Sequence, residues 1–337
     1  MIVTFSTNVF VAVTNVCRNA CAYCGFRARS PDDAFIVRVE DVERLFAECR
    51  GVATEALFSA GERPECAVGF DFRRMIADVC GEECSLVEYT VILCEIAIKH
   101  GLLPHTNIGV LSEQELMRLK DVNASMGLML ETVADIDAHK NSPGKHPKER
   151  LRTIEHAGRL KIPFTTGILV GIGEEESDRI ASLEAIAAIH RKFGHIQEVI
   201  IQPFAPKANT PFANRNPPMF EEVLRCVKWA REILPDDVAI QAPPNLISSA
   251  AELRALIDAG VSDLGGISAK THDYINPEAP WPSEKNLRRM IEPHILRERL
   301  PIYPKFIRKR WFSDKIRHLI EKYADSDGFK LPQEKSQ

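Results

Sequence analysis

The sequence has no excess of positive charge. Its 43 Lys and Arg residues are outnumbered by 47 Asp and Glu residues, which gives a formal net charge of −4. A nucleic-acid-binding domain is expected to be strongly basic, so this balance argues against nucleic acid as a partner. The short basic run Arg308-Lys309-Arg310 is better explained as a solvated surface than as a phosphate-binding patch.

The sequence also lacks a long apolar stretch. None of its apolar runs approaches the roughly 20 residues that are needed to cross a membrane. The amino terminus has no basic segment ahead of an apolar core, which a secretion signal would require. These two features predict a cytoplasmic protein with no membrane partner. Nine Cys residues in such a chain then predict reduced thiols rather than a disulfide framework.

No interdomain linker, low-complexity segment or short repeat interrupts the chain. Strand-like and helix-like segments alternate instead, which is typical of a parallel sheet covered by helices. The strand-like segments lie near residues 9–13, 56–58, 102–110, 124–131, 164–171, 199–201, 238–240 and 264–267. Helical patterns lie between them, near residues 39–49, 85–100, 147–160, 177–193, 218–234 and 249–259, and a capping box over residues 112–115 begins another helix.

These alternations predict an α/β protein with a (β/α)8 TIM-type barrel. Such barrels place their active site on the loops at the carboxyl ends of the strands. We expect one barrel domain over residues 1–283, which includes a functional loop at 14–27. A short C-terminal helical extension is expected over residues 284–337, packed on the barrel or partly flexible.

What the sequence does contain is a Cys-x3-Cys-x2-Cys run, formed by Cys17, Cys21 and Cys24 in the loop after the first predicted strand. Three thiolates this close in sequence can bind three irons of an iron–sulfur cube, and the fourth iron then stays open to a ligand that is not protein. A zinc site is disfavoured, because structural zinc needs a fourth ligand at a short spacing. The next Cys is Cys49 and the nearest His is His100. The run therefore predicts one 4Fe–4S cluster with an open iron.

The other cysteines carry weaker predictions. Cys49, Cys94 and Cys226 fall in helical patterns and are expected to be small core residues. A second group lies in a loop-rich insert and could hold an auxiliary cluster, although its spacing matches no established pattern: Cys66, Cys80 and Cys84.

With Tyr23 directly before the last Cys, the run resembles the motif of the radical S-adenosylmethionine (radical SAM) superfamily. This resemblance implies that the amine and carboxylate of SAM bind the open iron. It also implies that one electron from the cluster cleaves SAM and gives a 5′-deoxyadenosyl radical. In such an enzyme the cofactor performs the difficult chemistry, and the protein binds and orients the reactants.

Further candidate residues stand at the carboxyl ends of predicted strands. Gly61 and Glu62 follow the second strand, and Glu131 ends the fourth. Arg150 lies in the first turn of a helix, where the dipole disfavours a cation, so an anionic partner such as the SAM carboxylate would explain it. The segment GILVGIGE, which contains Gly171, resembles the adenine-contacting strand of the superfamily. An ordinary turn or strand end is the alternative for each residue.

Polar residues at the predicted barrel mouth suit a polyhydroxylated, hydrogen-bonding substrate. A ligand site typically combines an apolar lining with a few placed polar groups. For each of these residues, a capped turn or a packed strand end is an equally good explanation. The candidates for substrate contact are His105, Asn107, Thr165, Thr166, Gln202 and Asp273.

Longer strings narrow the resemblance to one family. The strings EALFSAGERPE, SMGLMLET, SPGKHPKERLRTIEHAG, IPFTTGILVGIGE and INPEAPWP resemble the CofG-type subunit of 7,8-didemethyl-8-hydroxy-5-deazariboflavin (FO) synthase. The resemblance runs from about residue 8 to residue 283. It implies a barrel of the biotin-synthase-like radical SAM kind, with Tyr23, Gly61, Glu62, Glu131, Arg150 and Gly171 as cofactor contacts.

The family resemblance also implies a reaction and partners. A CofH-type radical SAM enzyme would supply 5-amino-5-(4-hydroxybenzyl)-6-(D-ribitylimino)-5,6-dihydrouracil. This chain would act as a carbon–nitrogen lyase that converts that adduct to FO with release of ammonia. A reductant such as ferredoxin or flavodoxin would provide the electron. The alternatives are a related radical SAM enzyme for a different small metabolite, and an iron–sulfur electron carrier that never binds SAM.

Overall fold

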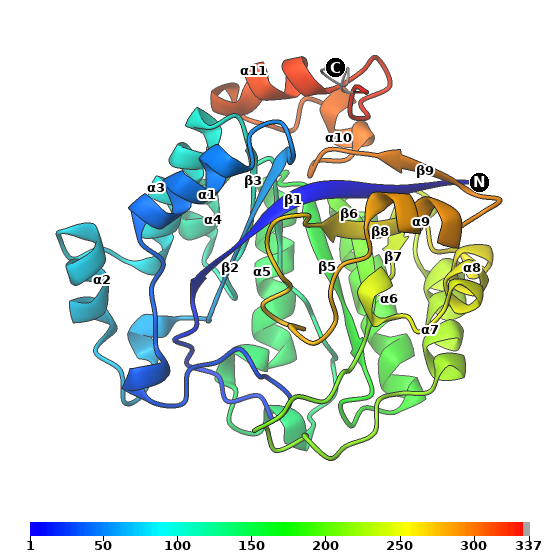
Figure 1. Ribbon diagram of the computed structural model, residues 1–337. Helices are drawn as coiled ribbons and strands as arrows, with labels where there is room; N and C mark the ends of the chain where they lie inside the picture. Colours follow the sequence, from blue (N-terminus) through cyan, green and yellow to red (C-terminus); the bar gives the residue numbers. More distant parts are fainter. Residues whose placement is uncertain (333–337) are drawn as a thin grey trace.

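The structure is a computed structural model that describes residues 1–332. Within these residues, eight parallel strands form a closed barrel, because β1 pairs with β8 on one side and with β2 on the other (Figure 1). The strands are β1 (Ile2–Thr14), β2 (Glu55–Ala60), β3 (Leu103–Asn107), β4 (Ser125–Gly127), β5 (Phe164–Val170), β6 (Ile196–Pro203), β7 (Ala239–Gln241) and β8 (Asp263–Ile267). The predicted (β/α)8 barrel is confirmed.

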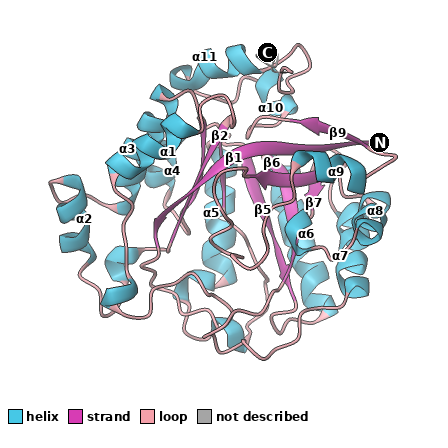
Figure 2. Ribbon diagram, viewed as in Figure 1, coloured by secondary structure: helices cyan, strands magenta, loops and turns pink. Residues whose placement is uncertain are grey.

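Helices connect the strands and cover the outside of the barrel (Figure 2). They are α1 (Val39–Glu48), α2 (Phe72–Cys80), α3 (Leu86–Lys99), α4 (Glu113–Lys120), α5 (Pro147–Arg159), α6 (Glu176–Phe193), α7 (Phe220–Ile233) and α8 (Ala250–Ala259). Local sequence sets several of their ends. Ser112 and Glu115 form the capping box that begins α4, as the sequence predicts. Gly260 ends α8 with a φ of 129°, a conformation that favours glycine.

Two segments differ from the prediction. The insert around residues 66–84 was expected to be rich in loops, but it contains α2, which packs Phe72 and Ile76 into the core. The segment after residue 283 was expected to be helical. It contains α9 (Glu284–Met290), α10 (Pro304–Arg308) and α11 (Asp314–Tyr323), but also β9 (Ile295–Glu298), which pairs in parallel with Ile2–Phe5 of β1. The predicted extension also includes residues 333–337, which lie outside the described part of the chain.

The C-terminal segment covers the amino ends of the barrel strands, opposite the loop that follows β1 (Figure 1). Leu300, Ile302 and Phe306 are fully buried there and form an apolar cluster with Leu103 and with residues of α11. Burial of apolar area at roughly 25 cal/mol per Å2 stabilises this cover. The C-terminal segment therefore closes the amino end of the barrel, and only the carboxyl end stays accessible to a ligand. No helix in the described part of the chain is long and apolar enough to span a membrane.

Candidate active site

Two connected cavities occupy the barrel interior. The upper one, of about 300 Å3, lies at the carboxyl ends of the strands, and the lower one, of about 200 Å3, lies beneath it. Asn107 and Gln202 line both cavities, so the two are continuous. A larger open groove of about 1120 Å3 runs outside the barrel along α5 and α6, but none of the three motif cysteines lines it. The interior cavities are therefore the candidate site.

All three motif cysteines line the upper cavity. The thiol sulfur of Cys17 accepts the backbone N–H of Asn19 at 3.4 Å and that of Glu62 at 3.2 Å. Burial raises the pKa of Cys17 to about 11 and also raises the pKa of Cys24. Buried thiols of this kind become stable thiolates when a bound cation compensates their charge. Among residues 1–332, no three His, Cys, Asp or Glu side chains converge on the position of a single metal ion.

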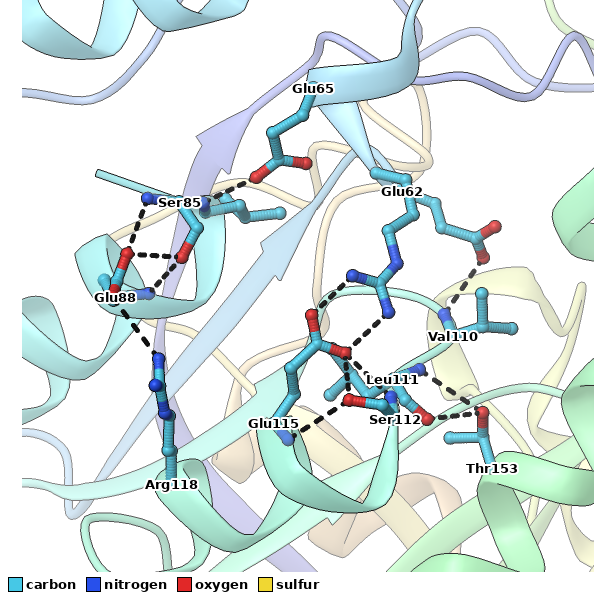
Figure 3. A network of polar contacts seen from close by, with 12 residues as sticks. Glu62, Glu65, Ser85, Glu88, Val110, Leu111, Ser112, Glu115, Arg118 and Thr153 are labelled. Carbon is cyan, nitrogen blue, oxygen red and sulfur yellow. Dashed lines mark hydrogen bonds and ion pairs between the residues drawn. The ribbon is translucent and has the colours of Figure 1, made fainter. Parts of the chain in front are cut away.

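The loop after β2 brings Glu62 to the cysteines. A Cβ atom at Gly61 would lie 2.0 Å from the carbonyl oxygen of Val16, so only glycine allows this close approach. The Glu62 carboxylate accepts the backbone N–H of Val110 at 3.1 Å (Figure 3). Its other oxygen lies 3.0 Å from Nη2 of Arg18. Both the backbone and the carboxylate of this predicted Gly-Glu pair are therefore held in place.

Two tethers hold the same loop on the outside of the barrel. Arg63 forms a two-pronged ion pair with Glu115, the residue that also caps α4. Glu65 accepts the backbone N–H of Leu86 at 2.8 Å, at the start of α3 (Figure 3). The N-termini of two helices thus fix the position from which Glu62 enters the cavity.

Arg150 enters the upper cavity from α5 and is 4% exposed. Its Nη1 lies 3.4 Å from Glu62 Oε2, and its Nη2 lies 3.7 Å from Glu131 Oε1. Its Nε has no hydrogen-bond partner among the residues that the structure describes. Guanidinium pairs are strongest when two parallel N–H groups contact one carboxylate at 2.7–2.9 Å. The long contacts and the unpaired Nε leave Arg150 with bonding capacity for a carboxylate ligand.

Glu131 lies in a strained backbone position beside this arginine. Its φ is 69°, in the left-handed region that non-glycine residues rarely adopt, and such strain concentrates at functional sites. Its backbone still pairs with β5, through a bridge to Ile168. Lys145 donates to the Glu131 carboxylate, so the side chain points into the upper cavity as an ion pair.

The two carboxylates stay ionised although they are buried. Burial by itself would raise the pKa of Glu62, but Arg150 and Lys145 outweigh it and hold the value below its ordinary level. The same balance, with Lys145 as the main cation, lowers the pKa of Glu131. The upper cavity therefore presents ionised carboxylates beside fixed cations at neutral pH.

Tyr23 and Gly171 differ in their relation to the cavity. Tyr23 lines it, and its hydroxyl lies 3.0 Å from Nε2 of His139. Gly171 follows β5 with a φ of 99°, and its N–H donates to Glu174 at 2.7 Å. It does not line either interior cavity, and its conformation alone explains the glycine.

The substrate candidates divide between the two cavities. Asn107 and Gln202 line both, whereas His105 and Thr165 line the lower one. Thr166 needs correction: it lines neither, because successive strand residues face opposite sides and Thr165 takes the inner one.

Asp273 also lines the lower cavity, but protein groups already occupy its oxygens. Oδ1 accepts the backbone N–H groups of Ile275 and Asn276, and Oδ2 accepts the side-chain amides of Asn245 and Asn276. This carboxylate organises the loop after β8. A substrate contact is therefore not needed to explain its position.

Several charged residues of the upper cavity escaped the sequence analysis. Lys145 and Lys207 line it, and Arg18 pairs with Glu62. Lys207 also contacts Asn276 at 2.8 Å, which links two loops of the mouth. Lys145 stands inside the string SPGKHPKER, five residues before Arg150, so the sequence did contain a signal for it. Arg18 lies inside the cysteine run itself, whereas Lys207 lies in a loop without a pattern, and only the fold places it.

None of the six cysteines outside the motif lines either of the two interior cavities. Cys49, Cys94 and Cys226 are buried core residues, as predicted. The sulfur atoms of Cys80 and Cys84 lie 3.5 Å apart near the end of α2, whereas Cys66 is exposed. All nine cysteines of the described chain are free thiols.

Comparison with solved structures supports the fold. The chain resembles the crystal structure of HydG, a maturase of the FeFe-hydrogenase, with a TM-score of 0.71 and 16% sequence identity over 93% of this chain and 67% of that chain. It also resembles methylornithine synthase (PylB), with a TM-score of 0.61 and 18% identity over 87% of this chain and 78% of that chain. At such low identities the likeness concerns the fold alone.

Sequence comparison gives the family. Residues 11–186 match the model of the radical SAM superfamily. The chain is 50% identical to the 7,8-didemethyl-8-hydroxy-5-deazariboflavin synthase of Archaeoglobus fulgidus, over 98% of this chain and 99% of that protein. It is 52% identical to the protein of the same name from Methanosarcina barkeri, over 97% and 99% of the two chains. The chain therefore belongs to the 7,8-didemethyl-8-hydroxy-5-deazariboflavin synthase family of the radical SAM superfamily.

Proposed function

We propose that this protein is a radical SAM carbon–nitrogen lyase of the CofG type. Its substrate is the hydroxybenzyl-ribityliminouracil adduct, and its products are FO and ammonia. The observation that carries this proposal is 52% identity over nearly the full length to a protein named FO synthase. The arrangement of the upper cavity supports it independently, because thiols and ion pairs that suit a cluster and SAM share one space.

The residues present fit a 4Fe–4S cluster. Cys17, Cys21 and Cys24 are soft thiol donors on one loop, and residues 1–332 offer no fourth Cys or His on the lining of the upper cavity. Backbone N–H groups that point at Cys17 would stabilise its thiolate. When bound, the reduced cluster supplies one electron to SAM, which releases methionine and a 5′-deoxyadenosyl radical.

The charged residues of the upper cavity fit SAM. Arg150 would bind the methionine carboxylate, since its Nε is unpaired and its contacts to Glu62 and Glu131 are long. Glu62 would accept the ammonium group, and Glu131 would accept ribose hydroxyls. Tyr23, on the cluster loop itself, would contact the cofactor, and His139 holds its hydroxyl. These roles follow the superfamily pattern and use charges that the site already presents.

The same proposal implies partners and a location. The adduct would come from a CofH-type radical SAM enzyme, either by diffusion or within a complex. The electron would come from a reductant such as ferredoxin or flavodoxin. The free thiols and the oxygen-sensitive cluster suit a cytoplasmic location.

An anaerobic assay tests the proposal. The reconstituted enzyme, reduced in the presence of SAM, should convert the purified adduct to fluorescent FO and give 5′-deoxyadenosine. The same enzyme given only tyrosine and 5-amino-6-ribitylaminouracil should give no FO, because one cluster motif serves one radical step. Cys21→Ala should abolish both products.

The outcomes separate the alternatives. An enzyme that cleaves SAM but never consumes the adduct would act on a different metabolite. A protein that forms no 5′-deoxyadenosine under any condition would be an electron carrier. Full activity of Cys21→Ala would contradict the cluster assignment.

A further inference from the structure

The lower cavity has a polar lining that the proposed SAM site does not use. It extends the upper cavity downward to the closed amino end of the barrel. Its volume of about 200 Å3 is far above the ~10–15 Å3 that a single water molecule requires. Most inward-facing groups here are polar, which is unusual for a barrel interior that normally packs branched apolar side chains.

Several polar atoms of this lining lack a protein partner within the described residues. Oδ1 of Asn8 has none, although Asn8 is only 3% exposed, and the indole N–H of Trp281 has none. Glu55 uses one carboxylate oxygen to accept from Ser6 at 2.6 Å, and no protein donor contacts the other. An unpaired buried polar group costs roughly 1–3 kcal/mol, so a ligand that pairs these atoms would recover that energy.

The tautomer of His105 adds another acceptor. Ser125 donates its hydroxyl hydrogen to the carbonyl oxygen of Pro301 at 2.7 Å. The 2.7 Å contact between Ser125 Oγ and Nδ1 of His105 must then use the hydrogen on Nδ1. Burial lowers the pKa of His105 to about 3, so the ring is neutral and its Nε2 carries a lone pair. This nitrogen has no protein partner in the described chain and belongs to a residue of the lining.

The only cation of the lining, within the described residues, is already neutralised. Arg299 contacts both oxygens of Asp263, at 2.6 and 2.8 Å, and also contacts Glu198 at 3.1 Å. A ligand with a phosphate or carboxylate group would therefore face hydrogen-bond acceptors and a carboxylate of the protein, and it would find no free cation to pair with. An aryl ring would leave the acceptors unpaired. The lining instead matches a neutral group that offers several O–H donors.

Resting on the proposed function, we propose that the lower cavity binds the ribityl chain of the adduct, with Asn8, Glu55 and His105 as its hydroxyl-binding residues. The ribityl chain is the one part of that substrate that presents several adjacent hydroxyls. This orientation places the ring system at the junction of the two cavities, next to the SAM site. It also keeps the carbinol C–H bonds, which are good hydrogen-atom donors, away from the adenosyl radical.

The test compares two ligands without turnover. Binding of the adduct and of an analogue with an n-pentyl chain in place of ribityl is measured by calorimetry, on the anaerobic holoenzyme with SAM but no reductant. The wild type should bind the pentyl analogue about 100-fold more weakly, because the analogue loses several hydroxyl contacts at once. Because no FO is formed, this measurement stays informative if the proposed reaction fails in the separate turnover assay.

Variants locate the contacts. Asn8→Leu should weaken binding of the ribityl compound about tenfold and leave binding of the pentyl analogue within about twofold. Glu55→Gln, which keeps the shape of the side chain, should show the same selectivity with a smaller effect. Thr166→Val is the matched control, because this buried hydroxyl lies on the outer side of β5 and has no partner within the described chain. It should change neither affinity.

Equal weakening of both ligands by Asn8→Leu and by Glu55→Gln would overturn the proposal. Equal affinity of the wild type for both ligands would overturn it as well. Retention of SAM binding in each variant shows that the barrel is folded, so a selective loss supports the assignment of the ribityl chain to this cavity.

Discussion

The barrel contains a buried ion cluster at each end, and the two clusters differ in how completely their charges are paired. At the amino end, Arg299 makes short contacts with Asp263 and Glu198, and its Nη1 donates to the carbonyl oxygen of Leu300 at 3.1 Å. At the carboxyl end, Arg150 is as deeply buried, but it makes contacts of 3.4 and 3.7 Å and has an unpaired Nε.

This difference follows from what covers each end. The C-terminal segment brings Arg299 and Tyr303 over the amino end, and Tyr303 donates to Glu198 at 2.8 Å. A fully paired buried cluster has nothing left to offer a ligand, so its effect is on stability. A cluster with incomplete pairing at the open end keeps hydrogen-bonding capacity for a charged ligand. Arginine burial alone therefore does not mark a site, whereas incomplete pairing does.

The largest effect is expected from Arg299→Met. This change leaves Asp263 and Glu198 buried without the cation that pairs with both of them in the described chain. Removing one partner of a buried pair typically costs about 3–5 kcal/mol. Denaturant unfolding of the anaerobic protein should show this loss. Arg297→Met, which breaks a partly exposed pair with Asp325, is the control and should cost less than ~1 kcal/mol. Equal losses in the two variants would contradict the comparison.

The second prediction is that buried carboxyl groups at the two ends of the barrel make folding stability depend on pH in opposite directions. Burial raises the pKa of Glu55 to about 7, from an ordinary value of 4.5. The folded state then holds the proton more tightly, so stability is fully present below pH 4.5 and falls as the pH rises to about 7. Glu62 and Glu131 have lowered pKa values, so their contribution is lost only as the pH falls below 4.5.

Glu55→Gln should remove this fall in stability between pH 4.5 and 7. The shift corresponds to about 3 kcal/mol at 1.36 kcal/mol per pKa unit. This effect is measured by denaturant unfolding of the variant and the wild type at pH 5 and at pH 7.5. The difference between their free energies of unfolding should change between the two pH values. If that difference were the same at both pH values, Glu55 would titrate normally, and its burial would not raise its pKa.

The third prediction concerns ligand binding at the open end. Arg150→Met should weaken SAM binding by tenfold or more, because a charge-assisted hydrogen bond contributes ~1.5–3 kcal/mol. Cluster content should not change. The loss of unfolding free energy should be smaller than for Arg299→Met, because Glu62 keeps Arg18 and Glu131 keeps Lys145. Calorimetry with Arg152→Met as control checks this, since Arg152 is exposed and pairs only with Glu149 within the described chain. Unaltered SAM affinity in Arg150→Met would remove this residue from the proposed site.

The smallest effect is expected from Arg18→Ala. Arg18 pairs with Glu62, but its side chain is 22% exposed and water screens the pair. The loss of unfolding free energy should stay below ~1 kcal/mol. Iron content after reconstitution should equal that of the wild type. A loss as large as that of Arg299→Met would show that the ion pairs at the carboxyl end of the barrel also serve mainly to stabilise the fold.

Much of this protein follows from local sequence. The spacing of Cys17, Cys21 and Cys24 predicted a cluster loop, and that loop lies at the end of β1, facing the upper cavity. The alternation of strand-like and helix-like segments predicted the barrel, because period-two and period-3.6 patterns depend on near neighbours in the chain. Glu62 and Glu131 could be singled out because strand ends in a barrel converge on one face, and Arg150 because a cation in the first turn of a helix opposes the dipole.

Tertiary structure alone decided the rest. No local pattern indicates that Arg299 would close the amino end, since its partner Asp263 is 36 residues away and Glu198 is 101 residues away. The same holds for Lys207, which lines the upper cavity from an irregular loop. Thr166 was misplaced because the side that a strand residue faces depends on register, and a shift by one residue exchanges inside and outside. The sequence by itself determined most of the barrel elements and the cluster loop, but not α2 or β9. Closure of the barrel brings charged side chains from distant parts of the chain together. It therefore determined which of these charges are paired and which can bind a ligand.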